Sequence, residues 1–381
     1  MTQAAVIPPV AGASERTRPG RIPWARPDFW GNEQDYVCDA LRSTWISGGP
    51  YVERLEAEVA EYCGVPYALA VSNGTTAIHL AFLALGIGPG DEVIVPGFCF
   101  MAAANMALHV GARPVFAEVD PKTWCLTAEE AEKHISPHTR AIVPVHTYGN
   151  VCDMEPILKL ARERSIVVVE DTAEAFATTY RGMKAGAIGD IGTYSFQATK
   201  TITTGEGGMV VTHDKALFEQ MILFRSHGMN RRRYWHEVAG HNFRLTNLQA
   251  ALGCAQMEKL DSITAQRRRV HRRYKNALGN SRGLILQWFD DDIDPVLWAM
   301  AVRLEPESYP QGRDSVIEQL MDAGIETRPG FYAASLMDVY DHPEVPICEG
   351  LGREIISLPT FPSLSDEEVV SICKTLEGLR S

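Results

Sequence analysis

The feature that most constrains this chain is a regular alternation of short apolar runs with helical patterns between about Leu69 and Thr212. The runs are rich in Val and Ile, and several are apolar throughout, which is typical of strands covered on both faces. Strands that alternate with helices predict an α/β layer with a mostly parallel sheet and right-handed connections. The predicted strands are Glu92–Pro96, Arg113–Val119, Ala141–His146, Ile166–Asp171, Ile191–Phe196 and Met209–Thr212, and the predicted helices include Thr75–Leu85, Thr127–Lys133 and Met154–Glu163.

After Thr212 the pattern becomes mainly helical, and it changes again near Gly283. We therefore expect a flexible N-terminal lead at residues 1–25, a large domain at residues 26–260 and a smaller C-terminal α+β domain at residues 261–381, which carries the long connecting helix. The elements expected in this half of the chain are helices at Lys215–Phe224 and within the long stretch Asn247–Leu278, followed by shorter elements at Leu297–Leu304 and Arg313–Ala323.

Charge and composition argue against several kinds of function. The formal net charge of −12 disfavours non-specific binding to nucleic acid or to an anionic membrane. No apolar run approaches the roughly 20 residues that a membrane-spanning helix needs, and the first 20 residues lack the apolar core of a secretory signal. The eight cysteines are scattered without a CxxC pair, so neither a metal site nor a disulfide framework is expected. We expect a cytoplasmic enzyme.

Two motifs lie where a helix begins and where a strand ends. The segment Ser72–Ala77 (SNGTTA) follows an apolar run and opens a helix, whose free N–H groups and dipole suit a phosphate; an ordinary N-cap is the alternative. The segment Val167–Glu174 (VVVEDTAE) ends an apolar strand in carboxylates, at the edge where open α/β sheets bind ligands. Asp171 there could hold the protonated ring nitrogen of an electron-sink cofactor, or it could cap the next helix.

Two further motifs follow in order along the chain. In Ser195–Lys200 (SFQATK) a lysine comes just after a buried strand. A partly desolvated lysine has a lowered pKa and can form a Schiff base, whereas a loop lysine at the surface is the alternative. In Thr203–Gly208 (TTGEGG) three glycines occupy four positions. Such a run indicates a tight backbone path beside a ligand or another chain, or a plain hairpin turn.

Taken together, these segments resemble the signatures of the DegT/StrS family of sugar aminotransferases. Ser195–Gly208 is similar to the family's lysine motif, and Ser72–Ala81 and Val167–Phe176 are similar to its other two signatures. The resemblance extends from about Trp30 to the C-terminus. Other similar segments are GIGPGDEVIVP (86–96), PVHTYGNVCDM (144–154), NFRLTNLQAALG (242–253) and SLPTFPSLSDEEV (357–369).

The resemblance implies an α/β fold of the fold-type-I aminotransferases, with a mostly parallel mixed sheet sandwiched by helices, and pyridoxal 5′-phosphate (PLP) as cofactor. It also implies a homodimer with shared active sites. By motif, Lys200 would hold the cofactor and Asp171 would pair with its pyridine nitrogen. The other implied cofactor residues are Gly74, Thr75 and Ser195 at the phosphate, Phe100 stacked on the ring, Glu174 beside the ring hydroxyl, and Asn242, which reaches the phosphate of the neighbouring subunit.

The implied reaction moves an amino group from L-glutamate to a keto-sugar, most simply a nucleotide-linked 4-keto-6-deoxyhexose. Lys200, once released, would carry the proton between the substrate and the cofactor as a general acid–base. His236 and Arg244 are expected to reach the neighbouring site. The full set of expected substrate residues is Trp45, Ser47, His236, Arg244 and Arg328.

Departures from the family pattern leave the acceptor open. Ala333 and Ser335 stand where proline and histidine are usual, near the expected substrate, and Ala177 stands where glycine is common. A cyclitol or another non-nucleotide ring is therefore an alternative acceptor. Sugar dehydratases of the family replace the lysine with histidine, so Lys200 argues against that reaction. A PLP-binding regulatory protein without turnover is an alternative of another class, although it would normally need an added effector or DNA-binding segment.

Overall fold

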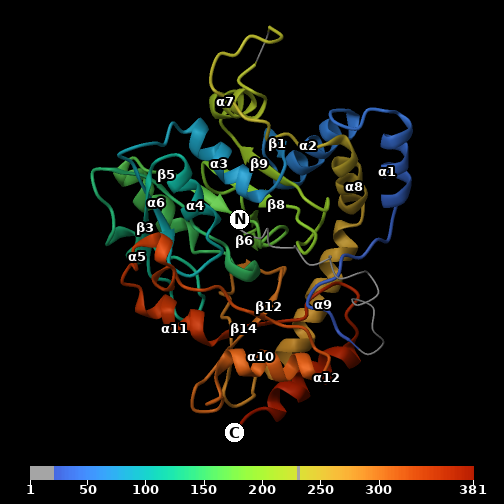
Figure 1. Cartoon of the computed structure of the whole chain (residues 1–381), viewed down its shortest axis with the longest axis vertical. Helices are drawn as coiled ribbons and strands as arrows, with labels where there is room; N and C mark the ends of the chain where they lie inside the picture. The colour runs from blue at the N-terminus through green and yellow to red at the C-terminus, as the bar shows by residue number, and fades with distance from the viewer. Residues whose placement is uncertain (1–20, 230–231) are drawn as a thin grey trace, which may run out of the picture.

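A seven-stranded mixed sheet forms the centre of the computed structural model, which describes residues 21–229 and 232–381 (Figure 1). The strand order is β1-β9-β8-β5-β4-β2-β3. The strands β8, β5, β4, β2 and β3 run parallel, while β9 is antiparallel to both of its neighbours. The bounds are β1 (Tyr67–Val71), β2 (Glu92–Pro96), β3 (Arg113–Ala117), β4 (Thr139–Ile142), β5 (Val167–Asp171), β8 (Ile191–Ser195) and β9 (Gly208–Thr212).

The predicted mostly parallel sheet is confirmed, and β4 differs most in extent from its prediction. The strand predicted at Ala141–His146 ends at Ile142. Pro144 follows, and a proline has no N–H to donate to a ladder. The chain stays beside β5 through isolated pairing of Val145 with Asp171. This irregular stretch carries His146 to the end of β5.

Helices cover both faces of the sheet because successive strand residues point to opposite sides. In β1, Leu69 and Val71 pack with α3 (Gly74–Ala84), α4 (Ala102–His109) and α7 (Lys215–Arg225). Ala68 and Ala70 face the other side, where they pack with α2 (Pro50–Cys63) and α8 (Asn247–Glu258). That side is completed by α5 (Ala128–Glu132) and α6 (Met154–Arg164), which pack on β2, β4 and β5. The remaining N-terminal helix is α1 (Glu33–Arg42).

The C-terminal part is built on a second sheet of order β10-β12-β14-β13, with an antiparallel arrangement throughout. Its strands are β10 (Leu284–Leu286), β12 (Met300–Leu304), β13 (Arg328–Pro329) and β14 (Ile355–Leu358), and its helices are α10 (Gly312–Asp322), α11 (Pro346–Glu354) and α12 (Asp366–Gly378). The small elements are the strands β6 (Thr179–Tyr180), β7 (Met183–Lys184) and β11 (Ile293–Asp294), and the 3₁₀ turns η1 (Thr147–Gly149), η2 (Ala334–Leu336) and η3 (Asp338–Tyr340).

The long helical stretch at Asn247–Leu278 consists of two helices. A capping box between Thr246 and Gln249 starts α8, and the chain leaves helical geometry at Lys259 before α9 (Leu260–Leu278) begins. Figure 1 shows α8 and α9 following each other along one side, from the large sheet towards the C-terminal sheet. The seven-stranded and the C-terminal sheet share no strand, which supports a division near residue 260, and we retain this division as a proposal.

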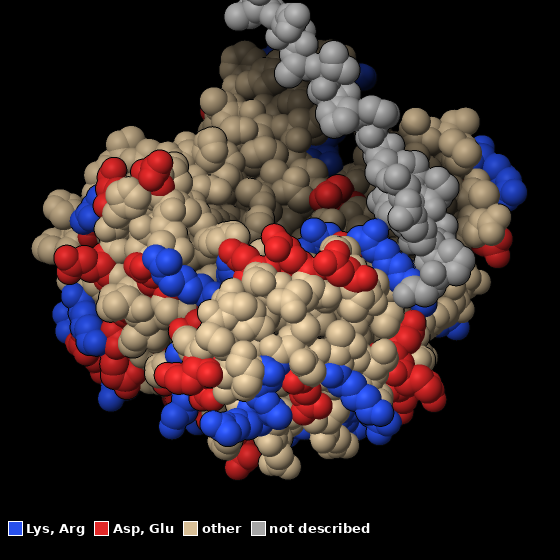
Figure 2. All heavy atoms as spheres, turned by 60° about the horizontal axis from the view of Figure 1, so that its bottom comes forward, with Lys and Arg blue, Asp and Glu red and all other residues tan. Residues whose placement is uncertain are grey.

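The predicted N-terminal lead falls partly outside the described residues, at residues 1–20. Residues 21–25 pack against the C-terminal sheet: Ile22 pairs with Ile325, and the Trp24 indole donates to Ser357 Oγ at 2.9 Å. Among the described helices, none is long and apolar enough to cross a bilayer. Figure 2 shows acidic and basic side chains intermixed over the face formed by the C-terminal part.

Candidate active site

A cavity of about 780 Å³ opens at the carboxyl ends of the parallel strands, the edge at which such sheets bind ligands. Residues far apart in the sequence meet there because β1, β2, β5 and β8 all end at this edge. Of the predicted cofactor residues, the cavity is lined by Gly74, Thr75, Phe100, Asp171, Glu174, Ser195 and Lys200.

One end of the cavity is formed by the N-terminus of α3. Asn73 caps this helix by accepting the Thr76 N–H at 2.8 Å, and the Thr76 hydroxyl accepts the Asn73 N–H. The N-cap interpretation is thus correct for Asn73, and it leaves Thr75 facing the cavity. A Cβ on Gly74 would lie 2.8 Å from Ser195 Cβ, so only glycine allows the helix start to approach Ser195. The result is a cluster of donors suited to a phosphate.

The glycine loop between β8 and β9 explains how this close approach continues. A Cβ on Gly208 would lie 2.6 Å from the Asn73 backbone, and one on Gly207 would lie 2.1 Å from Thr204 Oγ1. Gly205 adopts φ +82°, in the left-handed region that favours glycine. The glycine motif therefore allows the loop backbone to pass close to the start of α3.

Asp171 is the last residue of β5, and its carboxylate accepts the Ala173 N–H at 3.1 Å. Turns rather than a helix follow it, so the alternative in which Asp171 caps a helix does not apply. Burial raises the pKa of this carboxyl above its ordinary value, while the Ala173 N–H and the Lys200 amine act in the opposite direction. A bound cation would stabilise the ionised form, as a protonated ring nitrogen does.

Glu174 is the second buried acid of the cavity, and it accepts the Tyr148 N–H at 2.7 Å. Burial raises the pKa of Glu174 to about 7, against the opposing effect of Lys200. Tyr148 holds this position with φ +60°, a conformation that is uncommon for a residue with a side chain. Glu174 therefore lies where its proton can be exchanged near neutral pH.

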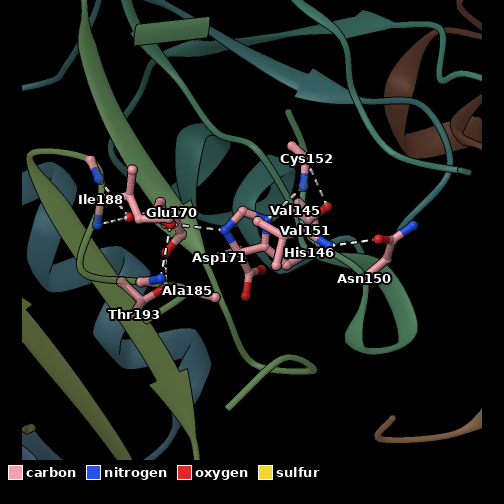
Figure 3. Close-up of polar contacts among 12 residues, drawn as sticks. Val145, His146, Asn150, Val151, Cys152, Glu170, Asp171, Ala185, Ile188 and Thr193 are labelled. Atoms are coloured by element: carbon pink, nitrogen blue, oxygen red, sulfur yellow. Dashed lines mark hydrogen bonds and ion pairs between the residues drawn. The ribbon is translucent and has the colours of Figure 1, made fainter. Parts of the chain in front are cut away.

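A buried histidine–glutamate pair braces the strand end that presents Asp171 (Figure 3). His146 Nε2 and Glu170 Oε2 are 2.9 Å apart, and both side chains are fully buried. Because His146 Nδ1 accepts the Cys152 N–H, the ring proton is on Nε2, which donates to Glu170. The carboxylate of Glu170 also accepts N–H groups from Gly186, Ile188 and Gly189.

The Glu170→Gln substitution is expected to destabilise the cofactor-free protein by about 3 kcal/mol. The side-chain amide of glutamine would place N–H hydrogens next to His146 and the backbone N–H groups, all of which are themselves hydrogen-bond donors. The free energy of unfolding, measured by urea titration, tests this. Glu132→Gln is the control, because the Glu132–Arg164 pair is exposed and should change stability by less than about 1 kcal/mol. Equal changes in the two variants would contradict the proposed bracing role.

Lys200 lies beyond β8 and lines the same cavity as the start of α3. Its Nζ is 3.6 Å from the centroid of the Trp298 ring, and the Trp298 indole donates to the Thr199 carbonyl at 3.1 Å. Burial lowers the pKa of Lys200, although Glu174 and Asp171 act in the opposite direction. The lysine is therefore a half-buried amine inside the cavity rather than a surface lysine.

The predicted residues Asn242, Trp45, Ser47, His236 and Arg244 do not line this cavity within the described chain. Asn242 and Arg244 are exposed and hydrogen-bonded to each other at 3.1 Å. His236 is exposed and belongs to the segment between α7 and α8, which Figure 1 draws as a loop that projects beyond α7. Residues 230–231 of its motif lie outside the described residues. Trp45 and Ser47 form an exposed turn whose carbonyls accept from Asn247.

Arg328 lines an adjacent cavity of about 830 Å³. The two cavities share walls formed by Phe100, Gln197, Thr199 and Trp298. Ala333 and Ser335 line neither cavity among the described residues; Ser335 Oγ donates to Glu349 instead. Ala177 adopts φ +77°, so alanine occupies a conformation that favours glycine.

Several side chains of the cavity were not predicted from the sequence. Gln197 and Thr199 are inside the lysine motif, so their position beside Lys200 was a usable signal. Trp298 lies just before β12 of the C-terminal sheet and has no local signature. His79 and His241 also line the cavity, with ring centroids 5.3 Å apart; burial lowers the pKa of His79 to about 4.

Comparison with known proteins identifies the family of this chain. Residues 28–377 match the DegT/DnrJ/EryC1/StrS aminotransferase family. The chain belongs to this family. It is 44% identical to the GDP-perosamine synthase of Caulobacter vibrioides, over 94% of this chain and 98% of the relative. It is 43% identical to the GDP-perosamine synthase of Escherichia coli O157:H7, over 94% and 99%. The PLP form of Spr1654 from Streptococcus pneumoniae superposes with a TM-score of 0.89 at 28% identity, over 94% and 98%.

The protein is thus a PLP-dependent aminotransferase of fold type I, as the resemblance implied. The residues of the cavity also fit that cofactor. They combine a helix start that glycine leaves accessible, a buried carboxylate and a half-buried lysine. In this aminotransferase PLP supplies an electron sink for charge developed at the substrate carbon. We assign Lys200 to the covalent link, Asp171 to the ring nitrogen and Gly74, Thr75 and Ser195 to the phosphate as proposals from the geometry.

Proposed function

We propose that this aminotransferase moves an amino group from L-glutamate to a nucleotide-linked keto-sugar, specifically a 4-keto-6-deoxyhexose of the kind that a GDP-perosamine synthase would use. The main support is the 43–44% identity to two proteins of that name over nearly their whole length. The segments STWISGG (43–49), HGMNRRRYWHEVAGHNFRLTN (227–247) and IETRP (325–329) carry a resemblance to the same enzymes. The product would be a deoxyamino sugar.

The residues of the cavity divide the chemical work in this proposal. The amine of Lys200 would take the proton from the α-carbon of the donor and deliver it to the cofactor, so that it acts as a positioned general acid–base. Its lowered pKa keeps a fraction of the amine neutral and able to accept a proton. The carboxylate of Asp171 keeps the ring nitrogen protonated, and the ring of Trp298 covers one side of the Lys200 amine.

We also propose a homodimer with shared sites in the cytoplasm. A partner subunit would give a function to Asn242, His236 and Trp45, which are exposed and lie away from their own chain's cavity. All eight cysteines are free, which fits a reducing compartment. Cross-linking between Asn242→Cys and a cysteine placed near the partner's phosphate site would test the arrangement.

An absorbance spectrum taken before and after addition of L-glutamate tests the donor half of the reaction. We expect the visible band of lysine-bound cofactor to disappear and 2-oxoglutarate to be released in equal amount. Keto-sugars linked to GDP, UDP or dTDP should then restore the band to different extents, with the GDP-linked 4-keto-6-deoxyhexose most effective. Restoration by a cyclitol ketone but not by nucleotide sugars would overturn the acceptor. A band that no donor changes would favour a regulatory protein without turnover.

A further inference from the structure

Arg267 is a buried arginine of α9 that reaches the reactive lysine from behind the cavity. Only 3% of its surface is exposed. Its Nη2 donates to the Lys200 carbonyl at 3.1 Å, and its Nη1 donates to the carbonyls of Leu297 and Trp298 at 3.1 and 3.2 Å. One guanidinium therefore contacts the backbone on both sides of the Lys200 amine.

The charge of this arginine is unusual in its surroundings. No carboxylate lies within ion-pair distance of Arg267 in the part of the chain that the structure describes. Burial lowers the pKa of Arg267 to about 10, although the more distant carboxylate of Asp28 acts in the opposite direction. Burying a cation without a partner is unfavourable, and dipoles of carbonyl groups compensate only in part. An apolar side chain would fill the same space at lower cost, so the packing alone does not account for an arginine here.

The contacts of Arg267 join two segments that must stay in register for the site to work. Lys200 belongs to the loop after β8, whereas Trp298 precedes β12 of the C-terminal sheet. The ring of Trp298 covers the Lys200 amine, and its indole donates back to Thr199. The planar fork of arginine can hold several acceptors in fixed directions, which a lysine cannot.

We propose that Arg267 is a positioning residue for Lys200, which fixes the lysine under Trp298 by its hydrogen bonds and keeps the amine reactive by its nearby positive charge. The charged groups that face the amine are Glu174 and Asp171, which favour its protonated form, and Arg267, which opposes it. Burial acts in the same direction as Arg267. Without Arg267 one of the effects that lower the pKa of Lys200 would be lost, so a larger fraction of the amine would be protonated at neutral pH.

Two substitutions separate position from charge. Arg267→Lys keeps a positive charge but loses the fork, and Arg267→Gln keeps an amide donor but loses the charge. Arg268→Gln is the matched control, because Arg268 is the next residue of α9 and pairs with Asp294 at the surface. Each full-length variant is compared by three measurements: the PLP dissociation constant of cofactor-free protein, the pH midpoint of Lys200 acylation by a small reagent, read by mass spectrometry, and the melting temperature.

In Arg267→Gln we expect the acylation midpoint to move to higher pH and PLP affinity to fall on the order of tenfold. In Arg267→Lys the midpoint should stay near that of the wild type, while PLP affinity falls by a similar factor. Arg268→Gln should resemble the wild type in all three measurements.

Wild-type PLP affinity and an unchanged acylation midpoint in both Arg267 variants would overturn the proposal, even if their melting temperatures fall. If Arg267→Gln does not fold, wild-type PLP affinity in Arg267→Lys is sufficient to overturn it. None of these measurements uses a sugar acceptor, so an error in the proposed substrate would leave their outcome unaffected.

Discussion

Lys200→Ala is expected to lower the rate of amino transfer on the order of 10⁴-fold and to remove the visible band of lysine-bound PLP. The variant loses both the covalent attachment point and the amine that carries the proton. PLP should still bind, more weakly, through the start of α3, Ser195 and Asp171, which remain in the cavity. Absorbance spectra of PLP-titrated protein and release of 2-oxoglutarate from L-glutamate measure the two effects separately.

The matched control is Lys184→Ala. Lys184 also lies over an aromatic ring, with Nζ 4.2 Å from the centroid of Tyr62 and hydrogen-bonded to its hydroxyl, but it does not line the cavity. This variant should keep both the band and the rate. If Lys200→Ala retained more than about a hundredth of the wild-type rate, another group would have to carry the proton, and the assignment of Lys200 would be wrong.

The strand-end residues could be predicted because their positions follow from local patterns. An apolar strand followed by acids places Asp171 at the ligand edge, and a glycine at a helix start places Gly74 opposite a phosphate. The same patterns predicted the bounds of β2 in full and those of β5 and β8 within one residue. Such patterns lie within one short segment, so they predict a site residue only when that segment alone determines where the residue lies.

Arg267 and Trp298 could not be predicted in this way. An arginine-rich helix such as α9 is typical of a charged, exposed face, and nothing local distinguishes Arg267 from Arg268. The two side chains lie in different environments, because Arg267 is buried and donates to the Lys200 carbonyl, whereas Arg268 forms an ion pair with Asp294 at the surface. Trp298 reaches Lys200 only after the C-terminal sheet has packed beside the large one. The positions of Arg267 and Trp298 in the site are therefore determined by contacts between segments that are distant in the sequence.

The expected substrate residues show a limit of another kind. Asn242, His236 and Arg244 were assigned to the neighbouring subunit by resemblance, and in a single chain they are exposed and away from the cavity. Their proposed role depends on the second subunit, so neither the sequence pattern nor the geometry of one chain tests it. Arg328 differs, since it already lines a cavity that adjoins the cofactor site.

Asp171→Asn is expected to lower kcat by about 10²- to 10³-fold while PLP remains bound. An amide can accept the Ala173 N–H as the carboxylate does, so the strand end should keep its shape. It has no negative charge, so it cannot hold a proton on the ring nitrogen, and charge developed at the substrate carbon is less stabilised. Single-turnover rates with L-glutamate report this loss directly, because they exclude product release.

Asp214→Asn is the matched control for this substitution. Asp214 also follows a strand of the sheet, but it caps α7 by accepting the N–H groups of Ala216 and Leu217. Asparagine caps a helix about as well as aspartate, so this variant should keep its kcat and its stability. A similar loss of rate in both variants would show that Asp171 acts through the backbone rather than through its charge.

The stability of the cofactor-free protein should change in the opposite direction from the rate. Burial raises the folded-state pKa of Asp171 above its unfolded value, so its contribution to stability is fully present below about pH 3.9 and is lost as the pH rises through the folded pKa. Asparagine does not titrate and escapes this loss. Asp171→Asn should therefore unfold at higher urea concentration than the wild type at neutral pH, and the difference should shrink in acid. A variant that is less stable at neutral pH would mean that Lys200 and the Ala173 N–H already compensate the buried charge without the cofactor.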